Sequence, residues 1–518
     1  MMPRPCLLFY ASLLFLIVFS YGGANAANIL ALTPVISHSH SMHVNVLTKA
    51  LAARGHKLVV LSPDEEKEKN ENITTILLEG AYSIDAFNSP LEHMPHSEGG
   101  LTSAHMMFYF GEETCRRLLF SEGNKRFYRD YRNHKFDLIL IDVGAGECFM
   151  KYAHVFENTP IVAFTAVFSP HSYMKGDFDH PAYVPFMYSV LTDRMTFRER
   201  FLNWFWYRYF FLARPYLYLP RIDELSQEFF GFYYPTVQDL ENRIALFLAN
   251  EHFSITHPKP RVPASIPVAG LHIAPPKPLP KDLKTFVSTA KDGVIYFSLG
   301  SNFESRLMSD ERKRLFLDAF AQLPQRVLWK YEDDSLPNIP SNVIIKKWFP
   351  QTDILGHNST VLFITHNGFL GTQEAVHYGV PMLGIPLLID QFKINAKVRS
   401  LGLGLRLDLK EITSSGQILD KIQAILNDPS YKQNAKRVST SFRDRPMTPL
   451  DTAVYWTEYV IRHKGADQLQ VASLDLNWFQ YHLLDIYAVI GVTIYALYYV
   501  LKKILGAIFK TDEKLKKS

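Results

Sequence analysis

Cysteine is scarce in this sequence, and neither sign of charge is in large excess. Three cysteines in 518 residues, with Cys6 close to the start, exclude a small fold held together by many disulfides. Cys115 and Cys148 could pair with each other, and the sequence leaves that open. A net charge of +4, with no basic stripe interleaved with aromatic residues, does not favour nucleic acid as a partner.

Internal repeats and low-complexity segments are also lacking, so a repeat architecture is excluded. The hydrophobic content of 47% and the charged content of 20% are ordinary for globular proteins, whereas the aromatic content of 14% is high. A chain of 518 residues is long enough for two domains of about 200–250 residues each.

The first residues, 1–26, have the pattern of a secretory signal peptide. Arg4 supplies a positive start, residues 6–20 form an apolar core, and Ala24-Asn25-Ala26 is a small-x-small cleavage site. An uncleaved membrane anchor is the alternative interpretation. We expect the mature chain to begin near Ala27, inside the secretory pathway.

Residues 483–503, near the other end of the chain, predict one transmembrane helix. The uncharged and mostly apolar run 486–501 is short against the roughly 20 residues that a span needs. Lys502 and Lys503 follow it, and their long side chains can reach back to the membrane surface. The sequence therefore predicts membrane attachment by a single C-terminal helix.

The tail, residues 504–518, is rich in lysine and is expected in the cytosol. Lys514 and Lys516 fit a di-lysine retrieval signal of the endoplasmic reticulum, with a simple stop-transfer tail as the alternative. The prediction is a single-pass type I protein of the endoplasmic reticulum membrane whose folded domains lie in the lumen.

Two sequons for N-linked glycosylation occur, at Asn72 and at Asn358. Asn72 follows a charged loop and is a plausible acceptor, although the sequence does not decide whether it is modified. Asn358 lies beside the stretch that carries most of the functional signal. A glycan there is expected to crowd the fold, so we disfavour that site.

The chain between its two ends predicts two α/β domains joined by a linker. Residues 27–256 open with a short apolar strand at 29–33, a histidine-rich loop at 37–43 and a helical pattern. Residues 257–281 are rich in proline and lack periodicity, as an extended connector does. Residues 282–482 again alternate strands and helices. The predicted fold class is α/β, with two doubly wound Rossmann-like domains.

The most informative stretch is 348–391. A β-branched apolar run at 361–365 predicts a buried parallel strand that ends at His366-Asn367-Gly368, and a helix is expected from about Gly371. A strand, a turn and a helix N-terminus direct N–H groups and a positive dipole to one point, which suits a diphosphate. Ligands of open α/β sheets bind at the carboxyl ends of strands. One crevice should therefore collect five polar residues: His366, Thr372, Glu374, Asp390 and Gln391.

This stretch resembles the donor-binding signature of the animal membrane-bound UDP-glycosyltransferases, a family that includes UDP-glucuronosyl- and UDP-glucosyltransferases. The matching positions are Trp348, Pro350-Gln351, Leu355-Gly356-His357, Thr365-His366, Gly368, Glu374-Ala375, Gly379, Pro381, Pro386 and Asp390-Gln391. The resemblance covers nearly the whole mature chain and is strongest from 298 to 482. It implies the GT-B fold, two facing doubly wound domains, with an acceptor-binding domain at 27–256 and a UDP-sugar-binding domain at 282–482.

The resemblance also implies roles for individual residues. Uracil is expected to stack on Trp348, and the ribose hydroxyls to bind Glu374. The sugar hydroxyls are assigned to Asp390 and Gln391. The remaining donor-binding residues are Gln351 beside uracil, and Ser301, His366, Gly368, Gly371 and Thr372 around the diphosphate. The UDP-sugar is a co-substrate, and neither a metal nor another cofactor is expected.

The histidine-rich loop holds the candidate general base. His38, His40 and His43 could bind a metal, could be ordinary loop histidines, or could include a base that takes a proton from an acceptor hydroxyl. The spacing from Ser39-His40 to His56 matches the family's catalytic histidine and the helix behind it. His40 is therefore predicted to be the base, with His38 as its main rival.

A base of this kind needs a carboxylate on its other ring nitrogen. Asp142 ends a buried apolar strand at 136–142, at the edge of the sheet where His40 is expected, and it falls at the family's second dyad position. The alternative is that Asp142 caps a helix starting near Gly144.

The segment 194–219 is loaded with aromatic residues, and Phe197, Phe201 and Phe205 recur at helical spacing. Three interpretations stay open for this helix. We favour a wall of the acceptor pocket or ordinary core over a helix that lies against a membrane interface.

The predicted function is inverting transfer of a hexose from a UDP-sugar to a hydroxyl or similar nucleophile of a small lipophilic acceptor, in detoxification or metabolite conjugation. UDP-glucose is favoured over UDP-glucuronic acid, because no arginine can be placed for a carboxylate. The alternative is a UDP-sugar-binding membrane protein with weak catalysis, since Asn367 replaces a usual glycine and Leu370 a frequent asparagine. The acceptor and the oligomeric state, a homo-oligomer included, are not set by the sequence.

Overall fold

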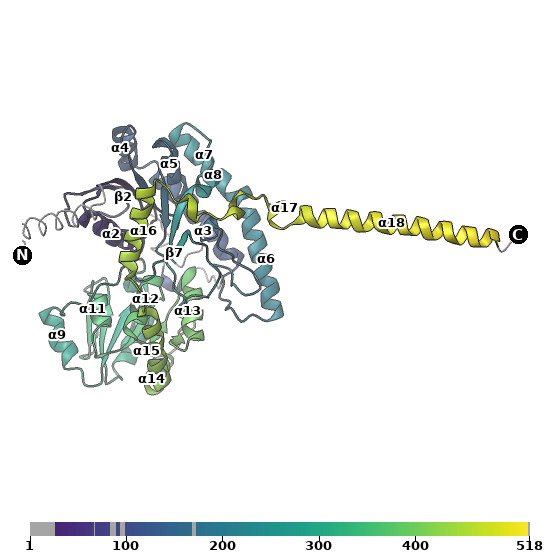
Figure 1. The fold of residues 1–518 in the computed structure, drawn as a ribbon. Coiled ribbons are helices and arrows are strands. Elements are labelled where there is room, and N and C mark those ends of the chain that lie inside the picture. The colour runs from purple at the N-terminus through teal and green to yellow at the C-terminus, as the bar shows by residue number, and fades with distance from the viewer. Residues whose placement is uncertain (1–25, 67, 83–89, 94–98, 168–171, 516–518) are drawn as a thin grey trace, which may run out of the picture. The chain divides into compact units, whose positions relative to one another are not determined.

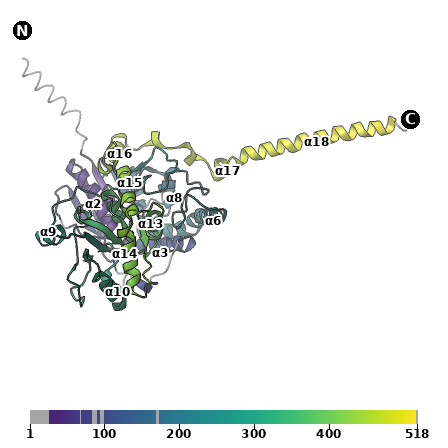
Figure 2. The same cartoon turned by 90° about the horizontal axis from the view of Figure 1, so that it is seen from below.

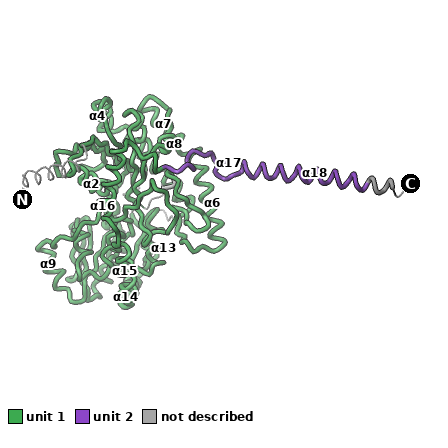
Figure 3. The backbone as a smooth tube through the Cα atoms, viewed as in Figure 1, with its two compact units in different colours: residues 1–469 green, residues 470–518 purple. Residues whose placement is uncertain are grey.

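The computed structural model describes residues 26–515 apart from 67, 83–89, 94–98 and 168–171. The predicted signal peptide, except Ala26, and Lys516 of the predicted retrieval signal therefore lie outside the described residues. The chain divides into two compact units, residues 1–469 and residues 470–518 (Figure 3). Each unit is described by itself.

The first unit contains two parallel sheets (Figure 1). The strands are short, and those inside each sheet are apolar and mostly buried, as strands covered by helices on both faces must be. The first sheet has the order β3-β2-β1-β4-β5-β6-β7. Its strands are β1 (Asn28–Leu32), β2 (Lys57–Ser62), β3 (Ile73–Leu77), β4 (Leu138–Asp142), β5 (Ile161–Phe164), β6 (Ile244–Ala249) and β7 (Ser265–Pro267).

The second sheet has the order β10-β9-β8-β11-β12-β13. Its strands are β8 (Val294–Ser298), β9 (Arg326–Lys330), β10 (Val343–Lys346), β11 (Thr360–Thr365), β12 (Met382–Gly384) and β13 (Gly404–Arg406). We call residues 27–267 the first lobe and residues 281–443 the second lobe. Two doubly wound α/β lobes confirm the predicted fold class.

Helices cover both sheets (Figures 1 and 2). Those of the first lobe are α2 (His38–Ala53), α3 (Leu101–Leu118), α4 (Glu122–Tyr131), α5 (Tyr152–Val155), α6 (Phe197–Ala213), α7 (Leu219–Phe230) and α8 (Val237–Asn242). Those of the second lobe are α9 (Lys281–Ser288), α10 (Asp310–Phe320), α11 (Gln351–Leu355), α12 (Phe369–Tyr378), α13 (Asp390–Ser400), α14 (Ser415–Asn427) and α15 (Pro429–Arg443).

The last helix of the first unit, α16 (Pro449–His463), returns to the first lobe. Its Ala453 and Val454 belong to the same core cluster as strands of the first sheet. The carboxylate of Glu458 accepts hydrogen bonds from Arg54 and lies 3.3 Å from Nε2 of the buried His56. The chain therefore crosses from one lobe to the other twice, and the second crossing joins the lobes independently of the proline-rich segment.

Two local predictions need correction. The histidine-rich stretch is not a loop, because α2 already begins at His38 with Ser37 as its N-cap residue. The proline-rich segment 257–281 is not only a connector, because it contains β7, which pairs with β6 of the first sheet. The proline of β7 is its last residue and is exposed, so no ladder hydrogen bond is lost.

The structure does not support the role that we favoured for the aromatic helix α6, a wall of the acceptor pocket or ordinary core. Phe197 and Phe201 are 77% and 58% exposed, and Phe205 is 44% exposed. The opposite face, with Tyr207 and Phe210, is the buried one. A pocket-wall or core role is therefore wrong for the three spaced phenylalanines, and the membrane-interface interpretation remains.

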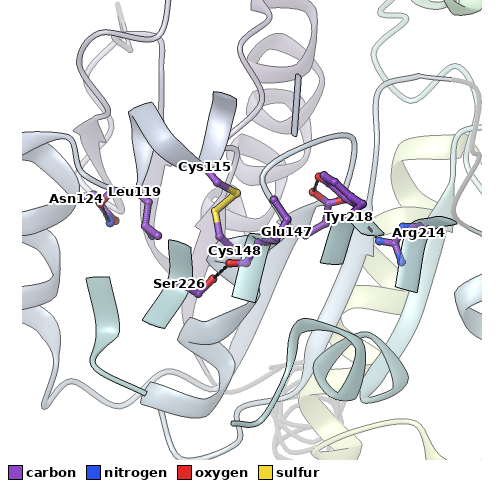
Figure 4. The surroundings of a disulfide bond; sticks show 9 residues. Cys115, Leu119, Asn124, Glu147, Cys148, Arg214, Tyr218 and Ser226 are labelled. Atoms are coloured by element: carbon purple, nitrogen blue, oxygen red, sulfur yellow. Dashed lines mark hydrogen bonds and ion pairs between the residues drawn. A yellow bond between two sulfur atoms is a disulfide. The ribbon is translucent and has the colours of Figure 1, made fainter. Parts of the chain in front are cut away.

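A disulfide between Cys115 on α3 and Cys148 settles the pairing that the sequence left open (Figure 4). The S–S distance is 2.19 Å, and Cys148 is part of the short 3₁₀ segment Glu147–Lys151 that follows β4. Beside it, Tyr218 donates to the buried Glu147 at 2.7 Å. Closing a loop between residues 33 apart stabilises the fold by about 3–4 kcal/mol on entropy grounds.

The second unit consists mainly of α17 (Trp478–Tyr481) and α18 (Leu484–Leu515). Among the described residues, one helix is long and apolar enough to cross a membrane. It is the stretch Leu484–Phe509, with 26 residues. The helix runs through Lys502 and Lys503, so the candidate span is longer than the predicted 483–503.

Candidate active site

A cavity of about 470 Å³ lies between the two lobes, at the carboxyl ends of the strands of both sheets. Residues of the loop after β1 and of α2 line one side of it. Residues that follow β8, β11 and β12 line the other side. The two lobes thus meet over a single space, and most of the polar residues predicted from the sequence line it.

His40 and Asp142 are in contact at this cavity. The imidazole Nδ1 of His40 lies 2.6 Å from Oδ2 of Asp142, and both side chains are almost fully buried. The other oxygen, Oδ1, accepts a hydrogen bond of 2.9 Å from the N–H of Gly144. No helix starts at Gly144, so the capping alternative for Asp142 does not hold. Because Nδ1 is engaged, Nε2 of His40 is the ring nitrogen that can take a proton.

Gly144 is required beside this pair. A Cβ at this position would lie 2.7 Å from Cε1 of His40 and 3.1 Å from Oδ1 of Asp142. The strand β4 ends at Asp142 and the chain must pass directly over the imidazole. Only a residue without a side chain fits that passage.

The other two histidines of the cluster point elsewhere. His38, the rival for the role of base, is half exposed, bonds to Asp64 at 2.7 Å and stacks on Tyr82. His43 is buried, and burial keeps its pKa well below the usual range. The three side chains do not converge, and within the described part of the chain no three or more ligand-type side chains gather in a way that could hold a metal.

His366 follows β11 and is clamped between two glycines. A Cβ at Gly300 or at Gly368 would lie 2.4 or 2.3 Å from ring atoms of His366. Burial, assisted by Lys330, lowers the pKa of His366 to about 3, so the ring is neutral near pH 7. Its buried Nδ1 has no hydrogen-bond partner among the described residues. A neutral ring can donate from one nitrogen to a phosphate oxygen.

The helix after this turn begins earlier than expected, at Phe369 instead of Gly371. The N–H of Thr372 consequently bonds to the carbonyl of Gly368 at 3.0 Å, within the helix. Thr372 also faces a second, small cavity and does not line the main one, whereas Gly371 does. The structure therefore does not bring Thr372 to the site, and the N–H groups at the start of α12 take its place.

Glu374 lies one turn further along α12, and its carboxylate accepts hydrogen bonds from Gln351 and Thr352 of α11. Burial raises the pKa of Glu374 above its ordinary value. Trp348 stands at the rim of the cavity and is 65% exposed, which leaves a face of the indole open. Trp348, Gln351 and Glu374 thus lie together at one end of the cavity.

Asp390 and Gln391 start α13, and both line the cavity. Burial raises the pKa of Asp390 to about 6, although the nearby His40 favours its ionised form. The Gln391 amide oxygen accepts from the N–H groups of Leu387 and Leu388 at 2.8 and 3.1 Å. This leaves its NH₂ group to donate to a ligand.

Asn367 keeps the turn intact where glycine is usual. Its φ of 58° is in the left-handed region, which asparagine tolerates. Its side-chain oxygen accepts from Asn395 of α13 at 2.9 Å. The turn after β11 is thereby tied to the helix that carries Asp390.

Several cavity residues were not identified from the sequence. Asn302, next to Ser301, donates to Ser37 of the first lobe at 2.7 Å and so joins the lobes at the cavity. The first-lobe wall is mostly apolar, and apolar residues scattered over five segments carry no motif that could have revealed them. They include Val35, Ile36, Met42, Met107, Phe110, Ala145, Val167 and Met187.

Two doubly wound lobes that face each other across a cavity at their strand ends define the class of GT-B glycosyltransferases. Solved structures share this fold at low sequence identity. A glycosyltransferase, VinC, in complex with dTDP has a TM-score of 0.57 and 15% identity, over 84% of this chain and all of that one.

The family follows from the sequence comparisons. A family model described as "UDP-glucoronosyl and UDP-glucosyl transferase" matches residues 28–518. UDP-glucosyltransferase 2 of Dactylopius coccus is 36% identical, over 98% of this chain and 99% of its own. Human UDP-glucuronosyltransferase 2B7 is 33% identical over 98% of each chain. The protein belongs to the family of UDP-glucuronosyl and UDP-glucosyl transferases, which confirms the predicted membership.

Proposed function

We propose that this enzyme transfers glucose from UDP-glucose to a hydroxyl of a small lipophilic acceptor, with inversion at the anomeric carbon. The observation that carries the proposal is the contact of His40 with Asp142 at 2.6 Å, in the cavity that also contains His366 and Asp390. Membership of a UDP-sugar transferase family supplies the reaction class.

The reaction is a single displacement. Nε2 of His40 takes the proton from the acceptor hydroxyl while the acceptor oxygen bonds to the anomeric carbon. The bond from that carbon to the UDP oxygen breaks, and its electron pair leaves with UDP. Nδ1–H of His40 donates to Asp142, which fixes the tautomer and stabilises the imidazolium that forms. Attack on the face opposite to UDP inverts the configuration.

The negative charge that develops on UDP meets neutral donors. His366 is neutral near pH 7 because burial lowers its pKa to about 3, and it donates an N–H without a competing positive charge. Ser301 and the N–H groups at the start of α12, including Gly371, are the other donors we assign. Gly368 makes room for the imidazole.

The nucleotide end of the donor is assigned to Trp348, Gln351 and Glu374. Uracil stacks on the exposed indole of Trp348, with Gln351 beside it. The Glu374 carboxylate now accepts from Gln351 and Thr352, and ribose hydroxyls can take over as donors to it. The sugar hydroxyls are assigned to Asp390 as acceptor and Gln391 as donor.

The preference for glucose rests on the charges around the cavity. Among its described lining residues, the lysines are Lys277 and Lys330, and there is no arginine. Lys330 ends β9 and pairs with Glu332 at 2.7 Å. Two strands separate β9 from β12, the strand that precedes Asp390, which amounts to about 14 Å across the sheet. A glucuronate carboxylate held near Asp390 would therefore meet a carboxylate instead of a cation.

The acceptor is proposed to be lipophilic because the first-lobe wall of the cavity is built from methionine, valine and other apolar side chains. We place the enzyme in the endoplasmic reticulum membrane, anchored by Leu484–Phe509 with the first unit in the lumen. The disulfide between Cys115 and Cys148 fits an oxidising compartment.

The test is a donor panel with the full-length protein in detergent. UDP-glucose and UDP-glucuronic acid are compared with one phenol as acceptor, and the anomeric configuration of the product is read by NMR. We expect a β-glucoside from UDP-glucose and at most slow transfer of glucuronic acid. Faster transfer from UDP-glucuronic acid, or retention of configuration, would overturn the proposal. Tight UDP binding without turnover would favour the alternative of a catalytically weak UDP-sugar-binding protein.

A further inference from the structure

A buried lysine on α13 joins the two lobes behind the cavity. Asp390 and Gln391 face the cavity from the first turn of α13, and Lys393 follows within the same turn but points into the junction between the lobes. Its Nζ donates to the carbonyl oxygens of Pro185 and Phe186 in the first lobe, at 3.3 and 3.1 Å.

The segment that accepts these hydrogen bonds leads into the part of the cavity wall that we assign to the acceptor. Met187 and Tyr188, which follow Phe186 directly, line the cavity. Helix α6 holds the same segment from within the first lobe. Oδ1 of its Asn203 accepts from the N–H of Phe186 at 2.6 Å, and its Nδ2 donates to the carbonyl of Val184 at 2.8 Å. From the second lobe, Lys393 holds this wall by hydrogen bonds.

The loop before α13 packs against the same place. Ile389 contacts the core cluster that contains Phe186, Met187 and Tyr188. Its φ of 45° and ψ of −108° are unusual for a β-branched residue, so neighbouring contacts must hold it there. Asp390 is therefore fixed from both sides, by Ile389 before it and by Lys393 after it.

The surroundings of Lys393 do not favour a charge. Burial lowers the pKa of Lys393 to about 7, with Asp179 and Glu251 acting to raise it and Lys259 and Lys397 acting to lower it. His257, which lines the small cavity beside it, is neutral because burial lowers its pKa to about 2. An amine kept in such a place at a cost in desolvation indicates a specific task.

We propose that Lys393 is a positioning residue that couples the acceptor wall to the sugar-binding carboxylate. By binding the carbonyls of Pro185 and Phe186, it keeps Met187 and Tyr188 at a fixed position relative to Asp390. Acceptor binding should therefore depend on Lys393, whereas UDP binding, which uses the other end of the cavity, should not. The inference rests on the proposed transfer reaction.

The experiment compares Lys393→Met with Lys397→Met in the full-length protein. Lys397 lies on the same helix and lines the same small cavity, but the carbonyls of Pro185 and Phe186 accept from Lys393 and not from Lys397. Binding of UDP and, with UDP present, of 4-methylumbelliferone as acceptor is measured by calorimetry, together with the acceptor KM. Lys393→Met should raise the acceptor Kd and KM by about tenfold through the lost hydrogen bonds, with UDP affinity unchanged. Lys397→Met should change neither.

Unchanged acceptor binding in Lys393→Met would overturn the inference, and so would an equal loss of UDP and acceptor binding, which marks a purely structural role. If Lys393→Met does not fold, Lys393→Gln is measured in its place, because its amide is too short to reach both carbonyls. Should the wild type fail to transfer glucose, the proposed function is wrong. The binding data would then still decide whether Lys393 controls the acceptor wall.

Discussion

Asp390 shows how a single carboxyl group, partly buried at the cavity, links stability to recognition. Burial raises its pKa to about 6, so ionisation costs folding free energy, and the sugar hydroxyls that we assign to it would compensate that cost when the donor binds. The native pKa lies above the unfolded value. Below its unfolded pKa, the Asp390 carboxyl therefore makes its full contribution to the free energy of unfolding. That contribution is lost as pH rises through about 6.

Replacing Asp390 with asparagine should accordingly stabilise the unliganded enzyme. We expect a gain of up to about 3 kcal/mol at neutral pH and a much smaller gain at about pH 4, where the native wild-type carboxyl is protonated. Transfer should fall because the acceptor of the sugar hydroxyls is weakened. Thermal unfolding of both proteins across this pH range checks the expectation, and a difference in Tm that does not vary with pH would contradict it.

Sequence reasoning at this scale succeeded where position along a strand decides the outcome. His40 and Asp142 were expected together because Asp142 ends a strand at the sheet edge where His40 lies, and because both match the family's dyad positions; the two side chains are in contact. The prediction for Thr372 was wrong because α12 starts two residues earlier than expected, and its side chain faces the second, small cavity. Lys393 could not be predicted, since its partners are backbone carbonyls roughly two hundred residues away in the sequence.

At the scale of elements, the turn between β11 and α12 depends on glycine for space. Gly368 has an ordinary φ of −58°, so alanine is tolerated by the backbone there, yet its Cβ would lie 2.3 Å from Nε2 of His366. Gly368→Ala should therefore displace the imidazole and weaken UDP binding by about 10- to 100-fold. Gly416→Ala is the control, because its Cβ would come no closer than 3.7 Å to another atom. Equal UDP affinity of the two variants by calorimetry would refute the steric argument.

Helix α6 presents an exposed aromatic face that no described residue covers, and a membrane interface is the interpretation that remains. Trp204 is 45% exposed on this helix. In nanodiscs with brominated lipids, the full-length protein should lose part of its tryptophan fluorescence. Trp204→Phe should reduce that loss, while quenching of Trp478, just before the candidate span, should persist. Trp348→Phe, at the rim of the cavity, should leave the quenching as it was. Equal quenching in all three proteins would rule out contact of α6 with lipid.

The periodicity of the sequence predicted which segments are strands and which are helices. It did not predict where these elements begin and end or which strands pair. The run at 361–365 became β11, one residue longer. The start of α2 was missed because serine favours turns and caps, and because Ser37, although it stands at the N-cap position, makes no side-chain cap hydrogen bond. The strand β7 was missed because three residues among prolines carry no alternation.

The whole first unit depends on contacts between its lobes. Besides Lys393, the lobes are joined by Asn302 with Ser37 at the cavity and by Gln373 with Asn250 behind it, at 2.7 and 2.8 Å. Helix α16 adds a third connection by packing against the first sheet. The sequence predicted two facing lobes from the family resemblance, but these contacts join residues far apart in the chain and had no signal in it.

The residues that we propose as the base and as the donor site lie in different lobes. His40 comes from α2 of the first lobe, and His366 and Asp390 come from the second. On the proposed mechanism, catalysis requires both lobes, whereas UDP binding requires only the second. A change confined to the base should separate these two properties.

The most direct test is the turnover of His40→Ala with UDP-glucose and a phenol, measured beside its affinity for UDP. Loss of the general base should lower kcat by about 10²–10⁴-fold while the Kd for UDP stays at the wild-type value. Turnover at the wild-type rate in this variant would contradict the central claim that His40 takes the acceptor proton.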